Sequence, residues 1–294
     1  LLPILDKSMI EHVVDVLPES QVDRVIVAAG YGVEKMREHF NGMSLPYELK
    51  IVEETEPLGT GGAIVNCKSY LTGNAFCVIN GDLVTSLRVE EMLEFHKSNG
   101  GIATISLWEV EDPSRFGVAD YRQESGKIMR FQEKPPKEEA YSNLINAGTY
   151  ILEPEIFQLM PEGAHSIERD VYEDLAATGG LNGFPFEGWF VDAGTPDSFV
   201  DATKVCIAEG RFASGKVSGD SWFGEGSENG GKVIGSSVGP EAVVKDGATI
   251  SNSVILEGAK IGADSVLENC LIGIGAKVPE GTELFGEIVD HSAL

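Results

Sequence analysis

The 294-residue sequence predicts an α/β domain with a mixed, mostly parallel sheet, followed by a parallel β-helix. In the first part of the chain, short aliphatic runs alternate with stretches of helical periodicity, which is typical of a sheet covered by helices. From residue 232 onward an aliphatic residue recurs about every six positions with glycines in between, the pattern of a β-helix. We therefore predict an α/β domain at 1–208, a linker rich in Gly, Ser and charge at 209–231, and a repeat domain at 232–294.

The elements of the α/β domain follow from periodicity and from boundary signals. Aliphatic spacing predicts helices at 10–17, 33–40, 90–97 and 196–208. Strands are predicted at 24–30, 47–52, 76–79 and 102–108, with the first expected to be buried and the third to be buried on both faces. A more antiparallel group is predicted at 116–119, 128–131 and 145–152. The capping-box spacing between Ser166 and the acids after it predicts one more helix start.

The composition is ordinary for a globular protein except for its charge: 47 acidic against 22 basic residues give a net charge of −25. Such a field repels nucleic acid and anionic membranes, so we expect neither as a partner. The four cysteines are far apart and the five histidines show no ligand spacing, which predicts free thiols and no zinc site. The apolar run at 1–5 is too short for a signal peptide, so we expect a cytoplasmic protein.

Two of the predicted strands end in an acidic residue. Phe76–Ile79 leads through Asn80-Gly81 to Asp82, and the strand after Gly188 leads to Asp192. Ligands of open parallel sheets bind beyond the carboxyl ends of the strands, where an acid can hold a metal or a substrate. The alternative for Asn80-Gly81-Asp82 is a surface turn, in which these residues are common.

A glycine-rich loop at 54–64 leads into a helix. Its glycines allow backbone N–H groups to approach a ligand closely, and a helix N-terminus favours anions and other acceptors. The loop is neither a Walker loop nor a GxGxxG motif, and the alternative is a flexible connection.

Two further motifs lie in the antiparallel group. Glu133-Lys134 places an acid and a base at a strand end before two prolines. Asn146-Ala147-Gly148 interrupts a strand with small residues, as happens where a ligand lies against the backbone. The alternative for Glu133-Lys134 is a solvated surface pair.

The repeat domain places eight aliphatic residues in near register, and each would bury its side chain in a stack between coils. They are Val238, Val244, Ile250, Leu256, Ile261, Val266, Ile272 and Val278. A histidine between coils would indicate an acyltransferase, but His291 at the chain end is the nearest one. We therefore interpret the repeat as an oligomerisation or regulatory module.

Together these motifs resemble those of the sugar-1-phosphate nucleotidyltransferases, and they occur in that family's order over nearly the whole chain. They are Glu56–Ala63, Asn80–Asp82, Phe116–Val118, Glu133–Pro135, Asn146–Gly148 and Trp189–Pro196, with the C-terminal hexapeptide repeat. Residues 58–60, 111–118, 130–135, 146–152 and 166–169 are most similar to the mannose-1-phosphate guanylyltransferase branch. The resemblance implies a Rossmann-like sheet and a left-handed β-helix.

The resemblance also implies a reaction: transfer of a nucleoside monophosphate from a nucleoside triphosphate to a sugar 1-phosphate, releasing pyrophosphate. GTP and mannose 1-phosphate are the expected substrates, and homo-oligomerisation through the β-helix is expected. The implied catalytic residues are Asp82, Lys134 and Asp192, with Mg²⁺ held by Asp82 and Asp192. The implied nucleotide-binding residues are Leu58, Gly59, Thr60 and Gly81, and those for the sugar phosphate are Glu133, Lys134, Asn146 and Gly148.

The chain departs from this family at its start. The family's first strand and its Gly-rich, Arg-containing triphosphate loop have no counterpart here, since the sequence given begins at Leu1-Leu2-Pro3. Two expectations follow: an enzyme whose activity is impaired in this short chain, or a non-catalytic regulatory paralogue that binds nucleotide-sugar.

Other functions fit less well. Uridylyl or thymidylyl transfer to glucose 1-phosphate is the alternative for the base and the sugar. A nucleotide-sugar glycosyltransferase is disfavoured because Asp82 is followed by Leu83-Val84 and forms no Asp-x-Asp motif.

Overall fold

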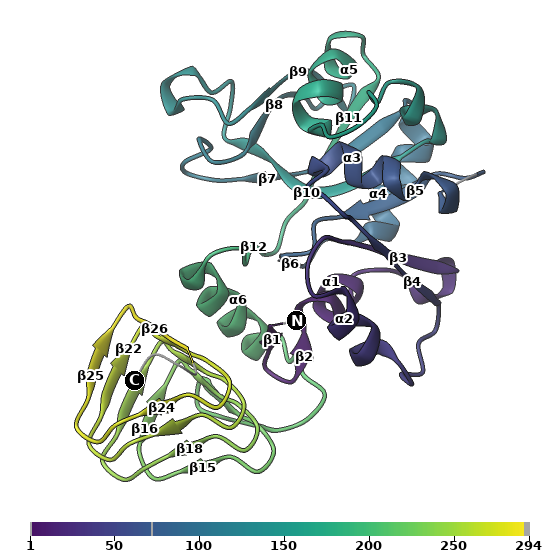
Figure 1. Cartoon of the computed structure of the whole chain (residues 1–294). Coiled ribbons are helices and arrows are strands. Elements are labelled where there is room, and N and C mark those ends of the chain that lie inside the picture. The colour runs from purple at the N-terminus through teal and green to yellow at the C-terminus, as the bar shows by residue number, and fades with distance from the viewer. Residues whose placement is uncertain (1, 72, 291–294) are drawn as a thin grey trace. The chain divides into compact units, whose positions relative to one another are not determined.

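The computed structural model describes residues 2–71 and 73–290, which form two compact units (Figure 1). Unit 1 comprises Leu1–Asp15, Gly81–Thr85 and Val191–Leu294, and unit 2 comprises Val16–Asn80 and Ser86–Phe190. Neither unit is one continuous segment of the chain. His291 lies outside the described residues.

Unit 2 is built on a six-stranded mixed sheet in the order β5-β10-β7-β11-β9-β8. β7 and β11 pair in parallel, whereas β10 runs antiparallel to β5, β7 and β8, and β9 runs antiparallel to β8 and β11. The antiparallel arrangement predicted after residue 110 is therefore confirmed. The bounds are β5 Phe76–Ile79, β7 Ala103–Glu109, β8 Gly117–Arg122, β9 Lys127–Glu133, β10 Leu144–Leu152 and β11 Leu181–Pro185.

A parallel pair of strands and several helices complete unit 2. The strands are β3 (Arg24–Ala29) and β4 (Glu48–Glu53). The α-helices are α2 Val33–Phe40, α3 Gly59–Asn66, α4 Val89–Asn99 and α5 Glu173–Ala177. Shorter turns are the 3₁₀ helices η1 Glu19–Gln21, η2 Lys68–Tyr70, η3 Lys137–Glu139 and η4 Pro154–Gln158, and the π-helix η5 Glu168–Tyr172. The predicted strand and helix alternation in this unit is confirmed.

The core of unit 2 is centred on β7. Ala103, Ile105 and Leu107 alternate along this strand, are fully buried, and belong to the same cluster as Tyr150 and Leu152 of β10. β5, in contrast, lies at the edge of the sheet, and its four residues all remain partly exposed. The prediction that this strand is buried on both faces is therefore wrong, because an edge strand is covered less completely than a central one.

The N-terminal part of unit 1 contains β1 (Pro3–Ile4), β2 (Lys7–Ser8) and α1 (Met9–Val14). The capping residue of α1 is Ser8, whose hydroxyl accepts from the Glu11 N–H while the Glu11 carboxylate accepts from the Ser8 N–H. Thr195 caps α6 (Pro196–Ala208), with Pro196 in its first turn, so the predicted helix is confirmed. In the described parts of both units, no helix is long and apolar enough to cross a bilayer.

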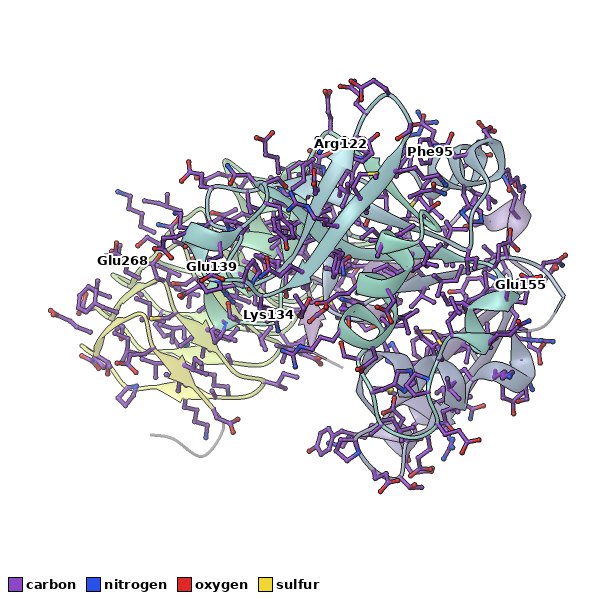
Figure 2. The ribbon with its side chains drawn as sticks, turned by 90° about the horizontal axis from the view of Figure 1, so that it is seen from above. Phe95, Arg122, Lys134, Glu139, Glu155 and Glu268 are labelled. Atoms are coloured by element: carbon purple, nitrogen blue, oxygen red, sulfur yellow. The ribbon has the colours of Figure 1, made fainter. Side chains whose placement is uncertain are left out.

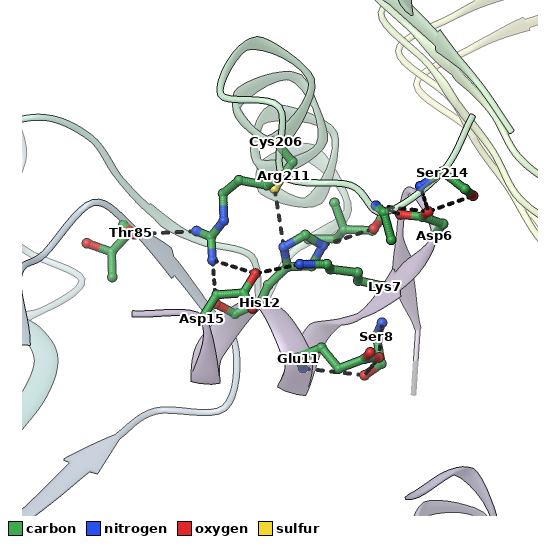
Figure 3. Close-up of polar contacts among 12 residues, drawn as sticks. Asp6, Lys7, Ser8, Glu11, His12, Asp15, Thr85, Cys206, Arg211 and Ser214 are labelled. Carbon is green, nitrogen blue, oxygen red and sulfur yellow. Dashed lines mark hydrogen bonds and ion pairs between the residues drawn. The ribbon is translucent and has the colours of Figure 1, made fainter. Parts of the chain in front are cut away.

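A polar cluster ties the segments of unit 1 together (Figure 3). The Arg211 guanidinium donates to the His12 carbonyl at 2.6 Å and to the Thr85 carbonyl at 3.4 Å. The Asp6 carboxylate accepts from the backbone N–H groups of Ala213 and Ser214. Because Arg211 and Ser214 follow α6 directly, these bonds fix the start of the β-helix to the N-terminal segment and to the chain around Thr85.

The β-helix of unit 1 consists of three parallel sheets (Figure 1). The first contains β14 Ser221–Phe223, β17 Ser237–Val238, β20 Val254–Ile255, β23 Leu271–Ile272 and β26 Ile288–Val289, with β13 Lys216–Ser218 antiparallel at its edge. The second contains β15 Glu228–Asn229, β18 Val243–Val244, β21 Lys260–Ile261 and β24 Lys277–Val278. The third contains β16 Lys232–Ile234, β19 Thr249–Ser251, β22 Val266–Glu268 and β25 Glu283–Phe285. The predicted β-helix is confirmed.

The first coil, from β14 to β17, advances by 15 residues, and from β16 onward each coil advances by 17, as in the bond from the Cys270 N–H to the Ser253 hydroxyl one coil earlier. Seventeen is one less than three times six, so the strict six-residue spacing slips once per coil. Ile255 and Leu267 therefore belong to the interior cluster, whereas Val266 is partly exposed and Leu256 is buried, as predicted, but outside that cluster. Within the predicted linker 209–231, β14 and β15 already pair in parallel with β17 and β18.

Replacing Ile272 by Ala tests this interior stack. Ile272 is fully buried, so Ile272→Ala should lower the free energy of unfolding of unit 1 by about 2–5 kcal/mol through lost burial and a cavity. Ile274 is 49% exposed, and Ile274→Ala is the matched control, with an expected change within about 0.5 kcal/mol. Urea unfolding followed by circular dichroism measures both. Equal losses in the two variants would contradict the stack.

Candidate active site

The pairing of β6 (Leu83–Thr85) with β12 (Phe190–Asp192) brings the two predicted acids together in unit 1. Asp82 directly precedes β6, and Asp192 ends β12. The Ala193 N–H donates to the Asp82 carbonyl at 2.8 Å, and the Gly194 N–H donates to Asp192 Oδ1 at 3.0 Å. A methyl group placed on Gly194 would lie 3.0 Å from Asp192 Oδ1 and 3.2 Å from Asp82 Oδ2. Both carboxylates therefore reach one small volume beside Gly194.

The two acids repel each other. Desolvation by neighbouring protein atoms, and then the negative charge of Asp192, raise the pKa of Asp82. Asp82 is nevertheless exposed, so solvent screens part of both effects. A cation bound between the carboxylates would relieve this repulsion.

The chemistry of the acid pair fits Mg²⁺, which takes oxygen ligands and is commonly held by one or two carboxylates together with substrate phosphates and waters. Among the described residues, no group of three or more Asp, Glu, His or Cys side chains is arranged to hold a metal. The remaining ligands would therefore come from phosphate oxygens and water.

In unit 2, the glycine-rich loop packs against the segment around His165. The N–H groups of Gly61 and Gly62 donate to the His165 carbonyl at 3.0 and 3.4 Å, and the His165 N–H donates to the Leu58 carbonyl at 2.9 Å. Gly59 has φ +70°, and a Cβ at this position would lie 2.6 Å from the His165 oxygen. The acceptor at this helix N-terminus is thus a backbone carbonyl of the protein itself, and only glycine permits so close an approach.

The Thr60 hydroxyl is also bonded within unit 2. It donates to Glu168 Oε2 at 2.5 Å and accepts from the Ile167 N–H at 3.1 Å. The Thr60 hydroxyl therefore both donates and accepts a hydrogen bond within the protein. Among the predicted nucleotide-binding groups of this loop, the backbone of Leu58 and Gly59 is the better candidate for contacting a base. Gly81 lies in unit 1 and is exposed.

The interruption predicted at Asn146-Ala147-Gly148 is confirmed, because the register of β10 against β7 shifts between Asn146 and Tyr150. The Gly148 N–H donates to Asn146 Oδ1 at 3.0 Å, and the Gly148 carbonyl accepts from the Asn80 N–H at 2.9 Å. Gly148 has φ +69°, a conformation that glycine adopts without strain. The Asn146 amide nitrogen donates to the Tyr150 hydroxyl at 3.1 Å.

Lys134, labelled in Figure 2, directly follows β9. Its φ of +50° is unusual for a residue with a side chain. Its N–H donates to the Phe116 carbonyl at 3.0 Å, and this bond holds the strained backbone. The Lys134 side chain is 57% exposed, whereas that of Glu133 is 12% exposed, and their charged groups are 3.7 Å apart. The pair is therefore only half solvated, and its lysine is free to meet a ligand from solvent.

Burial and then the negative charge of Glu168 raise the pKa of Glu133, while Lys134 and Arg169 oppose this rise. The sequence did not identify Glu168 as a site residue, although its charge acts on Glu133. Glu168 is only 7% exposed and lies within hydrogen-bonding distance of Thr60, Tyr150 and Ser166. The sequence contained one sign that Glu168 is buried. It lies between Ile167 and Val171, two apolar residues of one predicted helix.

Two models of known protein families match this chain. The nucleotidyl transferase family model matches residues 1–209, and the GlmU-like C-terminal hexapeptide model matches residues 203–291. Because the first match covers more than half of the chain, this protein belongs to the nucleotidyl transferase family.

Curated relatives extend the similarity over most of the chain. Mannose-1-phosphate guanylyltransferase 1 of Arabidopsis thaliana is 30% identical over 288 residues, which cover 93% of this chain and 79% of the relative. The catalytic subunit beta of mannose-1-phosphate guanylyltransferase from Danio rerio is 30% identical over 292 residues, covering 95% and 81%.

Among solved structures, HddC from Yersinia pseudotuberculosis is similar, with a TM-score of 0.59 and 28% identity over 69% of this chain and 88% of that one. The same protein has also been solved in complex with GMP-PN.

The pKa of Asp82 provides a test of the acid pair. Asp192→Asn removes the repelling charge, so the pKa of Asp82 should fall toward the ordinary value of about 3.9, while the desolvation effect stays. Carbon-13 NMR titration of the carboxyl groups measures it. Asp197→Asn, which changes an exposed acid in the first turn of α6, is the control and should leave the titration unchanged.

The raised pKa of Asp82 also determines how the stability of the folded protein changes with pH. A folded-state pKa above the unfolded value means that the folded protein binds the proton more tightly, so stability falls as the pH rises through the interval between the two values. Asp192→Asn should narrow this interval. An unchanged pKa of Asp82 in that variant would refute the electrostatic coupling of the two acids.

Proposed function

We propose that this protein transfers GMP from GTP to mannose 1-phosphate, forming GDP-mannose and pyrophosphate. The observation that carries the proposal is the convergence of Asp82 and Asp192 beside Gly194, in a chain that belongs to the nucleotidyl transferase family. The choice of base and sugar is supported by the mannose-1-phosphate guanylyltransferases that align with 93–95% of the chain.

In this reaction an oxygen of the sugar phosphate attacks the α-phosphorus of the nucleotide, and the bond from that phosphorus to the bridging oxygen breaks as pyrophosphate leaves. The attacking phosphate is already ionised at neutral pH, so the protein needs no strong general base. It must bring two anions together and stabilise the charge that develops.

In this proposal the two acids are the metal ligands that the protein provides. Asp82 and Asp192 hold Mg²⁺, which when bound neutralises phosphate charge and orients the phosphate oxygens. The raised pKa of Asp82 agrees with this role, because a cation relieves the repulsion between the two acids.

The other roles are assigned from the chemistry of each group. Lys134, with its exposed ammonium, binds the phosphate of the sugar. Glu133, Asn146 and Gly148 bind the sugar, since a carboxylate and an amide suit its hydroxyls. The backbone of Leu58, Gly59, Thr60 and Gly81 binds the nucleotide. We further propose that the protein acts in the cytoplasm as a homo-oligomer assembled through its β-helix.

The reaction is tested by a pyrophosphate-release assay on the product of the full open reading frame. GTP, ATP, UTP and dTTP are each combined with mannose, glucose and N-acetylglucosamine 1-phosphate in the presence of Mg²⁺. The proposal expects the fastest release with GTP and mannose 1-phosphate. Faster release with UTP or dTTP and glucose 1-phosphate would reassign the substrates, and no release with any pair would favour a regulatory paralogue.

Lys134→Ala tests the role of the lysine. Removal of a charge that stabilises the transition state should lower turnover about 10²–10³-fold while the melting temperature stays nearly unchanged. Lys137→Ala is the matched control: Lys137 lies three residues further on, its side chain is also 57% exposed, and it pairs with Asp112. This control should keep near-normal turnover. Equal activity of the two variants would refute the assignment of Lys134.

A further inference from the structure

Glu168 is a buried carboxylate on which three segments of unit 2 converge. Its Oε2 atom accepts hydrogen bonds from the hydroxyls of Thr60 at 2.5 Å and Ser166 at 2.7 Å. Its Oε1 atom accepts from the Tyr150 hydroxyl at 3.2 Å. Thr60 belongs to the glycine-rich loop and Tyr150 to β10, so one side chain bonds to two elements that are 90 residues apart in the sequence.

The direction of these hydrogen bonds is set by the carboxylate. An ionised carboxylate only accepts, so Tyr150 must donate to Glu168 and can accept from the Asn146 amide nitrogen. With its nitrogen turned to Tyr150, Asn146 presents its oxygen to the Gly148 N–H. The Gly148 N–H, which can only donate, sets this orientation of the Asn146 amide, and Tyr150 connects that amide to Glu168 through two consecutive hydrogen bonds.

The surroundings of Glu168 hold it in place. It begins the π-helix η5, and π-helical turns are rare and frequently occur at functional sites. Tyr172 at the end of this turn packs edge-on against Tyr150, with ring centroids 5.4 Å apart. Hydrogen bonds to a buried charge are about twice as strong as those between neutral groups, so displacement of one donor disturbs the others.

We propose that Glu168 is a positioning residue that couples the nucleotide loop to the sugar pocket, so that each substrate strengthens the binding of the other. This inference rests on the proposed function for the identity of the two pockets. When one ligand orders Thr60 or Asn146, the Glu168 network is ordered with it, and the second ligand then binds to a site already arranged. By thermodynamic linkage the effect is reciprocal.

The coupling is measured by calorimetry in the absence of Mg²⁺, so that binding is recorded without turnover. The ratio of the Kd of GTP without and with saturating mannose 1-phosphate gives the coupling factor, for which about fivefold or more is expected in the wild type. Glu168→Gln should bring this ratio close to one. Glu162→Gln, which changes an exposed acid in the same connection, is the matched control and should keep the wild-type ratio.

A second variant separates coupling from a purely structural role. Tyr150→Phe removes one hydroxyl from β10 and keeps the ring, so it should weaken the effect of mannose 1-phosphate on GTP binding even if Glu168→Gln fails to fold. A structural role alone would lower the melting temperature of Tyr150→Phe and leave its ratio at the wild-type value.

The outcomes distinguish this inference from the proposed function. A wild-type ratio of one, or wild-type ratios in both Glu168→Gln and Tyr150→Phe, would overturn the coupling even if the wild type releases pyrophosphate. A ratio that falls in the variants would support the coupling even if the wild type releases none, in which case only the proposed reaction fails. If the wild type releases no pyrophosphate with Mg²⁺ and binds neither GTP nor mannose 1-phosphate with or without Mg²⁺, both are wrong.

Discussion

The pairing of β6 with β12 is the constraint on which the candidate chemistry depends. It places two carboxylates side by side although like charges repel, and it does so with backbone hydrogen bonds that are indifferent to that charge. Desolvation, and then this repulsion from Asp192, raise the pKa of Asp82. Two adjacent carboxylates repel each other unless a cation lies between them. Such unfavourable electrostatics are often found at functional sites.

The acid pair belongs to the same compact unit as the β-helix. Arg211 and Asp6 connect the chain that enters the β-helix with α1, β6 and the N-terminal strands. Because Thr85 is three residues from Asp82, the Arg211 bond to its carbonyl supports the strand that presents the acid. The β-helix is therefore built into the framework of the acid pair and is more than an appended repeat.

Unit 2 shows a different way to organise polar groups. Its central carboxylate, Glu168, is buried and satisfied by three hydroxyls, whereas Lys134 remains exposed on a strained backbone. Groups that hold a geometry are bonded inside the protein, and the lysine that we propose binds the sugar phosphate is left in solvent. By the same principle, the hydroxyl of Thr60, a residue implied to bind the nucleotide, is bonded within the protein to Glu168 and Ile167.

The sequence by itself determined the features that depend on near neighbours: the helices α1 and α6, the acids Asp82 and Asp192 next to strands, the interruption at Asn146, and the periodic repeat. It misassigned Leu256 and Val266 to the interior cluster because a coil of 17 residues is visible only once neighbouring coils pair. The resemblance implied that Asp82 and Asp192 share a site, and the tertiary structure shows that the pairing of β6 with β12 brings them together. Only the tertiary structure decided that Glu168 joins Thr60, 108 residues away, to Tyr150. Periodicity reports which face of an element is buried, but it carries no information about which distant donor will meet a buried acceptor.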